Sequence, residues 1–151
     1  MTQGKVALVD AEDFERLNKY KWCFDSSVGY PQRTLWKSDE KKQVSWWMHW
    51  EVIGKPKKGL DVDHVNGNKL DNRQINLRVA TRSQNSSNRR RSKNNTTGYK
   101  GVTQPKGSKK FLAQIKFNGK HFHLGMFLTK ELAHQAYCEA SNKYHKEYGR
   151  H

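Results

Sequence analysis

The chain has 151 residues, of which 34% are hydrophobic and 28% charged, with a formal net charge of +15 and a mean hydropathy of −1.07. This length and composition allow one domain or two small ones, and they exclude a large apolar core. No run of about 20 apolar residues is present and the first residues lack the apolar stretch of a signal peptide, so we expect a cytoplasmic protein that is neither secreted nor bound to a membrane. Two distant cysteines exclude a four-cysteine zinc site.

The N-terminal part predicts a small mixed sheet. Short alternating patterns favour strands, and an acidic segment between the first two favours a single helical turn. The strands are expected over residues 5–10, 20–24 and 30–36, and the helical turn over residues 11–17. Residues 43–53 are rich in Trp, Val and Ile and predict a buried strand or helix. His49 lies within this segment, so its simplest interpretation is a packed, hydrogen-bonded histidine.

A strand, a polar loop, a returning strand and a helix are expected next. The strands are predicted over residues 60–65 and 77–80, and the loop between them starts at Asn66-Gly67. Thr81 or Ser83 is expected to cap a short helix that runs to Arg90.

Residues 89–97, RRRSKNNTT, contain no apolar residue and predict a basic linker, or an arm that becomes ordered only on its partner. We therefore expect one domain over residues 1–88 and a second over residues 98–151.

The second domain predicts a three-stranded antiparallel sheet packed on one helix. Apolar residues alternate over 111–117, Asn118-Gly119 is a strong hairpin signal, and alternation resumes through Phe122 and Leu124. Thr129 can cap the helix, and residues 99–104 can supply the third strand. The helix covers one sheet face and leaves the other exposed.

The distribution of charge points to nucleic acid. No Asp or Glu occurs between Asn72 and Lys130, a stretch that holds many lysines and arginines. A polyanion relieves this self-repulsion, and release of its counterions drives binding. The alternative, a solvated basic surface, does not require the removal of every acid.

Residues 61–88 combine the groups that phosphodiester hydrolysis needs. Water must be activated by a base that titrates near neutrality, and a hard cation held by oxygen ligands must offset the charge that develops on the phosphate. His64 can be the base, Asp63 a ligand, and the amide oxygen of Asn85 a second ligand.

This segment resembles the HNH homing-endonuclease family, of phage or mobile-element type. The resemblance rests on Asp63-His64, on Asn76 twelve residues after the histidine, and on Asn85 nine residues further on. It implies a ββα-metal fold with one Mg²⁺ or Mn²⁺ ion, His64 as general base, Asp63 and Asn85 as metal ligands, and Asn76 as the asparagine that ties the loop and helps orient the histidine. Many members have His where Asn85 stands, and Asn88 is the alternative ligand.

Residues from Gly98 onward resemble a second family, the AP2 DNA-binding domain. The matching motifs are Tyr99-Lys100-Gly101-Val102, Phe111-x-Ala113-x-Ile115, Leu124-Gly125-x-Phe127-x-Thr129 and Ala133-x-x-Ala136-Tyr137. The resemblance implies a sheet laid in the major groove of double-stranded DNA. The implied DNA contacts are Lys100, Thr103, Lys116, His121 and His123, to which the basic arm adds Arg89, Arg90 and Arg91.

The sequence therefore predicts an α+β protein with a ββα-metal nuclease core, a small N-terminal mixed sheet and a C-terminal AP2-like sheet on one helix. The predicted activity is metal-dependent endonucleolytic cutting of DNA in a phage-infected or bacterial cell. A non-catalytic DNA-binding regulator and an RNA-directed protein are the alternatives. The oligomeric state, the target sequence and the number of strands cut stay open.

Overall fold

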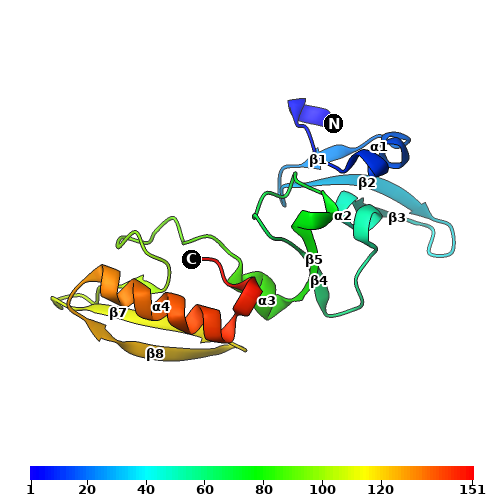
Figure 1. Ribbon diagram of the computed structural model, residues 1–151. Helices are drawn as coiled ribbons and strands as arrows, with labels where there is room; N and C mark the ends of the chain where they lie inside the picture. Colours follow the sequence, from blue (N-terminus) through cyan, green and yellow to red (C-terminus); the bar gives the residue numbers. More distant parts are fainter. The chain divides into compact units, whose positions relative to one another are not determined.

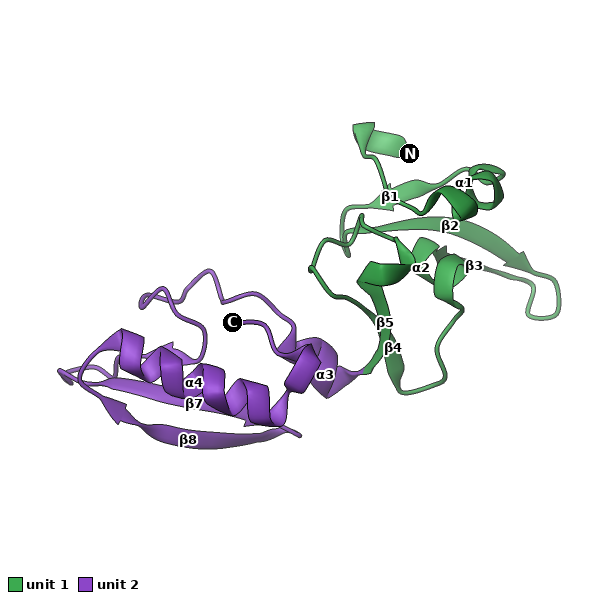
Figure 2. Ribbon diagram, viewed as in Figure 1, with its two compact units in different colours: residues 1–80 green, residues 81–151 purple.

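The computed structural model describes residues 1–151 and divides them into two compact units, Met1–Ala80 and Thr81–His151 (Figure 2). The fold is of the predicted mixed α+β kind with small sheets. No helix is long and apolar enough to cross a membrane.

The first unit is built on an antiparallel three-stranded sheet (Figure 1). Its strands follow the order β1-β2-β3 and are β1 (Cys23–Asp25), β2 (Tyr30–Lys37) and β3 (Lys42–Trp47). The 3-10 helix η1 (Thr2–Gly4) and the helices α1 (Ala11–Asn18) and α2 (Met48–Ile53) belong to the same unit. Leu17, Trp22 and Met48 form its buried core, so α1 and α2 are held by one small apolar cluster.

The first unit also contains a two-stranded sheet of β4 (Leu60–His64) and β5 (Leu77–Thr81). A long polar loop joins them and contains the 3-10 helix η2 (Gln74–Asn76). Strand, loop and returning strand thus lie where the sequence predicted them.

Three N-terminal predictions need correction. The sheet β1-β2-β3 is antiparallel throughout and not mixed, because each of its strands pairs only with an antiparallel neighbour. Residues 5–10 form no strand, because only Leu8 pairs: it makes an isolated bridge with Asp71 in the β4–β5 loop, through hydrogen bonds from its N–H to Leu70 O (2.8 Å) and from Asn72 N–H to its carbonyl (2.7 Å). Residues 43–53 are strand and helix in succession, since β3 ends at Trp47 and α2 begins at the next residue.

The second unit begins with α3 (Arg82–Ser87), whose N-terminus is closed by a capping box between Thr81 and Gln84. An antiparallel sheet of order β6-β7-β8 follows, made of β6 (Val102–Thr103), β7 (Phe111–Phe117) and β8 (Lys120–Phe127). Thr129 caps α4 (Lys130–Tyr144), and η3 (Lys146–Tyr148) comes after it. The predicted hairpin and capped helix are present, whereas the third strand, expected over residues 99–104, is limited to Val102–Thr103.

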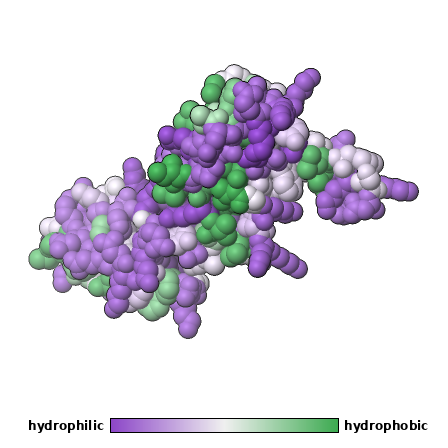
Figure 3. Space-filling model, turned by 45° about the vertical axis from the view of Figure 1, so that its right-hand side comes forward, coloured by the Kyte–Doolittle hydropathy of each residue, from purple (hydrophilic) through white to green (hydrophobic).

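The helix α4 covers one face of this sheet (Figure 1). Ala113 and Ile115 of β7 point into the core, where they are 0% and 2% exposed, and pack with residues of α4. Gly101 allows the close approach of α4: its φ is +75°, and a Cβ there would lie 1.9 Å from the Tyr137 ring. The surface shown in Figure 3 is largely hydrophilic, with separate hydrophobic patches.

The boundary between the compact units differs from the predicted linker. It falls between Ala80 and Thr81, so α3 groups with the C-terminal sheet and helix. The last residues of the expected linker are also structured, since Asn95 donates to the carbonyls of Tyr99 (2.8 Å) and Val102 (3.2 Å) and the hydroxyl of Thr97 donates to Val102 O (3.0 Å). These local hydrogen bonds could not be predicted from the composition of the segment, which is basic and polar.

Candidate active site

Asp63 and His64 end strand β4, and each is only 4% exposed. The carboxylate of Asp63 accepts two hydrogen bonds at Oδ2 from Arg78 of β5, from Nε at 2.9 Å and from Nη2 at 2.7 Å. The β4–β5 sheet therefore places a guanidinium against a buried carboxylate, and these charge-assisted hydrogen bonds fix the position of the carboxylate.

His64 is surrounded by rings and one asparagine. Its Nε2 lies 3.4 Å from Oδ1 of Asn72, a residue with no exposed surface. The rings of Tyr30 and His49 lie 5.7 and 5.4 Å from the His64 ring, measured between centroids. Burial lowers the pKa of His64 below its usual 6.5, so the ring is neutral at pH 7 and able to accept a proton.

The loop that carries Asn72 is closed by a network of asparagine and aspartate side chains. Asn76 accepts from Asn66 N–H at 2.9 Å and donates to Asp71 O at 2.7 Å. Asp71 is 1% exposed and binds Nε and Nη2 of Arg73 at 2.8 and 2.7 Å, which holds its pKa at about 2. These contacts fix the loop against the end of β4.

The expected site residues are therefore distributed over both units. Asp63, His64 and Asn76 belong to the first unit, and Asn76 makes contacts that tie the loop. The asparagine within hydrogen-bonding distance of the histidine is Asn72. Asn85 lies in α3 of the second unit and the alternative, Asn88, is the C-cap of that helix.

The donor set near β4 is of the oxygen type. No three His, Cys, Asp or Glu side chains gather as a metal site. One carboxylate is nevertheless what Mg²⁺ commonly uses at sites where waters and substrate phosphates complete its coordination. The buried Asp63 carboxylate fits that chemistry, with Arg78 as the cation that holds it.

The expected DNA contacts in the second unit separate into two groups. The register pairs Thr103 with Leu112 and Gln114 with His123, which places Thr103 and His123 on the sheet face opposite α4. His121 pairs with Lys116 at the end of the hairpin, where the Lys116 side chain lines a cavity together with Tyr137 of α4. Lys100 departs from this face: it precedes β6, and its ammonium donates to Ser87 O at 2.6 Å and Arg150 O at 2.9 Å. Arg89, Arg90 and Arg91 follow α3 and are exposed.

Sequence reasoning missed three residues that shape the site. Asn72, Arg78 and Tyr30 contact His64 or Asp63, and two of them lie in the segment that was already singled out. The signal that was available for Arg78 is strand alternation, since a cation in the returning strand can face an acid in β4. Tyr30 comes from a distant strand and left no such signal.

Comparisons with known proteins show similarity to HNH endonucleases. Residues 47–87, from the end of β3 through α3, match the family model described as HNH endonuclease. A protein of Acanthamoeba polyphaga mimivirus named "Uncharacterized HNH endonuclease L560" is 33% identical over 136 residues, which cover 89% of this chain and 68% of the mimivirus protein. "Protein 3.8" of Escherichia phage T7 is 36% identical over 72 residues, 47% of this chain and 60% of the phage protein. No solved structure matches.

Proposed function

Since this chain belongs to the HNH endonuclease family, we propose that it is a divalent-metal-dependent, homing-type nuclease that hydrolyses phosphodiester bonds of double-stranded DNA. The observation that supports it best is the buried His64, neutral at pH 7, next to the Asp63 carboxylate at the end of β4. Family membership favours this activity over a non-catalytic regulator.

His64 is the general base in this proposal. Asn72 Oδ1 accepts from Nε2–H, and the neutral imidazole takes the proton from the attacking water. Asn72 and the Tyr30 and His49 rings fix the plane of the imidazole, so its reacting atom is aligned before substrate binds.

Asp63 is the proposed carboxylate ligand of one Mg²⁺ or Mn²⁺ ion, and the family resemblance adds Asn85 as an amide ligand. When bound, the ion would neutralise charge on the scissile phosphate and the leaving 3′ oxygen. Arg78 holds the Asp63 carboxylate in a fixed position through its two hydrogen bonds.

The second unit supplies DNA binding in this proposal. Its exposed sheet face carries Thr103, His121 and His123, side chains able to donate or accept hydrogen bonds to base edges, and Lys116 adds a cation at the end of β7. The exposed arginines 89–91 add contacts to the phosphate backbone.

A plasmid-nicking assay with Mg²⁺ tests the nuclease. We expect His64→Ala to cut about a hundredfold to ten-thousandfold more slowly than wild type, because it lacks the base. Glu15→Ala, which removes an exposed side chain of α1 outside the site, is the control and should cut like wild type. Full cutting by His64→Ala would remove His64 from its role, and no cutting of any DNA by wild type would refute the proposed activity.

A further inference from the structure

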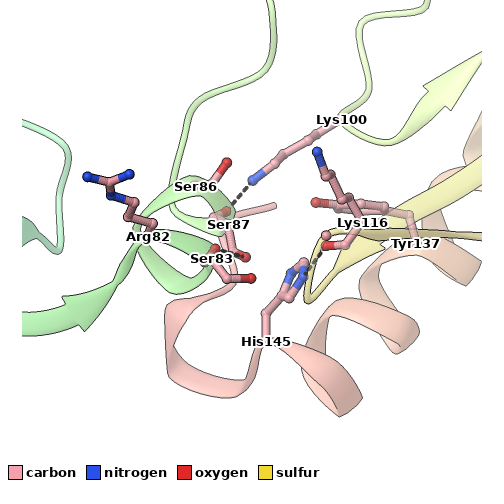
Figure 4. A pocket seen from close by; sticks show the side chains of 9 residues that line it. Arg82, Ser83, Ser86, Ser87, Lys100, Lys116, Tyr137 and His145 are labelled. Carbon is pink, nitrogen blue, oxygen red and sulfur yellow. Dashed lines mark hydrogen bonds between the residues drawn. The ribbon is translucent and has the colours of Figure 1, made fainter. Parts of the chain in front are cut away.

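A polar cavity lies within the C-terminal unit, apart from the residues assigned to catalysis. It has a volume of about 380 Å³. Figure 4 shows Lys100, Lys116 and Tyr137 on one side and Ser86 and Ser87 of α3 on the other. The full lining is Arg82, Ser83, Ser86, Ser87, Lys100, Lys116, Gly119, Tyr137 and His145.

The cavity combines cations and hydroxyls without any acid. Arg82, Lys100 and Lys116 contribute positive charge, and no Asp or Glu lines the cavity. Lys100 and Lys116 extend toward the serines of α3, whereas the Arg82 guanidinium is turned away from them (Figure 4). An anion with several acceptor oxygens is the ligand that such a set of donors recognises.

The Lys100 ammonium is fixed in position by hydrogen bonds to two backbone carbonyls. An ammonium has three N–H donors, and two of them bind Ser87 O and Arg150 O, so the charge is fixed at the cavity wall rather than on a mobile side chain. Hydrogen bonds to carbonyls satisfy donors but do not neutralise the charge. A bound anion would do both.

We propose that this cavity binds one phosphate group of a nucleic-acid backbone. The chemical class follows from the cavity itself, and the choice of nucleic acid as its source rests on the proposed function. Two features favour a nucleic-acid strand over a small phosphate compound as the ligand. The exposed arginines 89–91 directly follow α3, and the whole segment between Asn72 and Lys130 has no acid, so the cavity belongs to a long basic stretch suited to a polyanion.

The protonation of Lys100 gives the site a pH dependence. Burial, with a smaller contribution from Arg150, lowers the pKa of Lys100 to about 8. The other titratable groups near Lys100 are Lys116, Tyr137 and His145 of the cavity, and His151. The pKa of His151 is itself lowered, by burial and by Lys100. Tyr137 has a pKa of about 12 because it is buried, so it stays neutral through this range. Phosphate binding is therefore expected to weaken as the pH rises through about 8.

The test measures binding of the full chain to a short DNA duplex in EDTA, over a series of salt concentrations. Ser86→Asp places a negative charge in the cavity at an exposed position of α3, away from the sheet face. Gln135→Glu makes the same change of charge on the exposed side of α4 and is the matched control. We expect Ser86→Asp to lower the slope of log Kd against log salt by about 1 and to weaken binding about tenfold at low salt, with the control close to wild type.

A second arm uses inorganic phosphate and backbone amide NMR shifts, compared with chloride at equal ionic strength. Phosphate should shift amides of residues 83–87 and 100 in wild type but not in Ser86→Asp. Equal salt slopes for the two variants would overturn the proposal, and so would phosphate shifts without any change in DNA binding, which would assign the cavity to free phosphate. If the wild-type protein cuts no DNA but Ser86→Asp still weakens DNA binding, the phosphate-binding role of the cavity stands and only the nuclease activity is refuted.

Discussion

Acidification should destabilise the first unit through His49. This histidine is 4% exposed, its Nδ1 has no hydrogen-bond partner, and its ring packs against those of Tyr30, Trp50 and His64. Burial, with a smaller effect of His64, lowers its pKa from 6.5 to about 3. The sequence predicted a packed, hydrogen-bonded histidine here; the packing is confirmed, but Nδ1 makes no hydrogen bond.

The sign follows from proton uptake. Between pH 6.5 and pH 3 the unfolded chain protonates His49 and the folded chain does not, so the free energy of unfolding falls as the pH falls through this window. Each pH unit below 6.5 costs about 1.4 kcal/mol, and pH 5 lies about 1.5 units below, so the first unit should lose about 2 kcal/mol between pH 7 and pH 5 through this residue. His64, whose pKa is also lowered, adds to the same trend.

Urea unfolding followed by tryptophan fluorescence measures this loss. All five tryptophans lie between residues 22 and 50, so the signal reports the first unit alone. His49→Phe keeps a ring in the cluster and removes the titration, so its pH profile between 7 and 5 should be flatter than that of wild type by about 2 kcal/mol. His121→Phe, at an exposed site of the second unit, should leave the profile unchanged. Parallel profiles for wild type and His49→Phe would refute the reasoning.

Three further substitutions test the loop, the sheet and the alignment of the base. Asp71→Asn should destabilise the first unit by about 1–3 kcal/mol in the same urea assay, because the buried carboxylate no longer pairs with Arg73. Gly101→Ala should cost the second unit about 2–5 kcal/mol, since the residue has positive φ and its Cβ would overlap the Tyr137 ring; the circular dichroism melt should change while tryptophan fluorescence does not. Asn72→Ala removes the acceptor beside His64, the proposed general base, and should lower kcat about tenfold to a hundredfold with KM unchanged, as steady-state cleavage would show.

The elements that local signals specify were predicted well. Asn118-Gly119 forms the β7–β8 turn with both residues at positive φ, 47° and 80°, which is the conformation this pair favours. Thr129 accepts from the N–H of Leu132 as an N-cap, and Thr81 forms the capping box of α3. In each case the determining atoms lie within a few residues of one another, so the pattern is complete in the sequence.

Long-range contacts at the site could not be predicted in the same way. Leu8 looked like part of a strand, but its bridge to the β4–β5 loop depends on where that loop lies in space. The same holds for Tyr30, which reaches the His64 ring from β2. Asn72 was visible in the motif, yet its spacing does not distinguish it from Asn76, and only the hydrogen bonds show that one ties the loop and the other contacts the histidine.

Lys100 shows why counting charges cannot replace geometry at a nucleic-acid interface. The resemblance to the AP2 domain implied that Lys100 is a DNA contact on the outward sheet face, and a strand was expected over residues 99–104. In the structure β6 contains only Val102 and Thr103, so alternation does not extend to residue 100. The ammonium is instead fixed by two carbonyls at the wall of a cavity. A lysine fixed in this way loses little side-chain entropy when an anion binds, whereas a solvated lysine must be ordered first. The half-buried cation is therefore expected to contribute more to phosphate binding, per charge, than the exposed cations that dominate the composition.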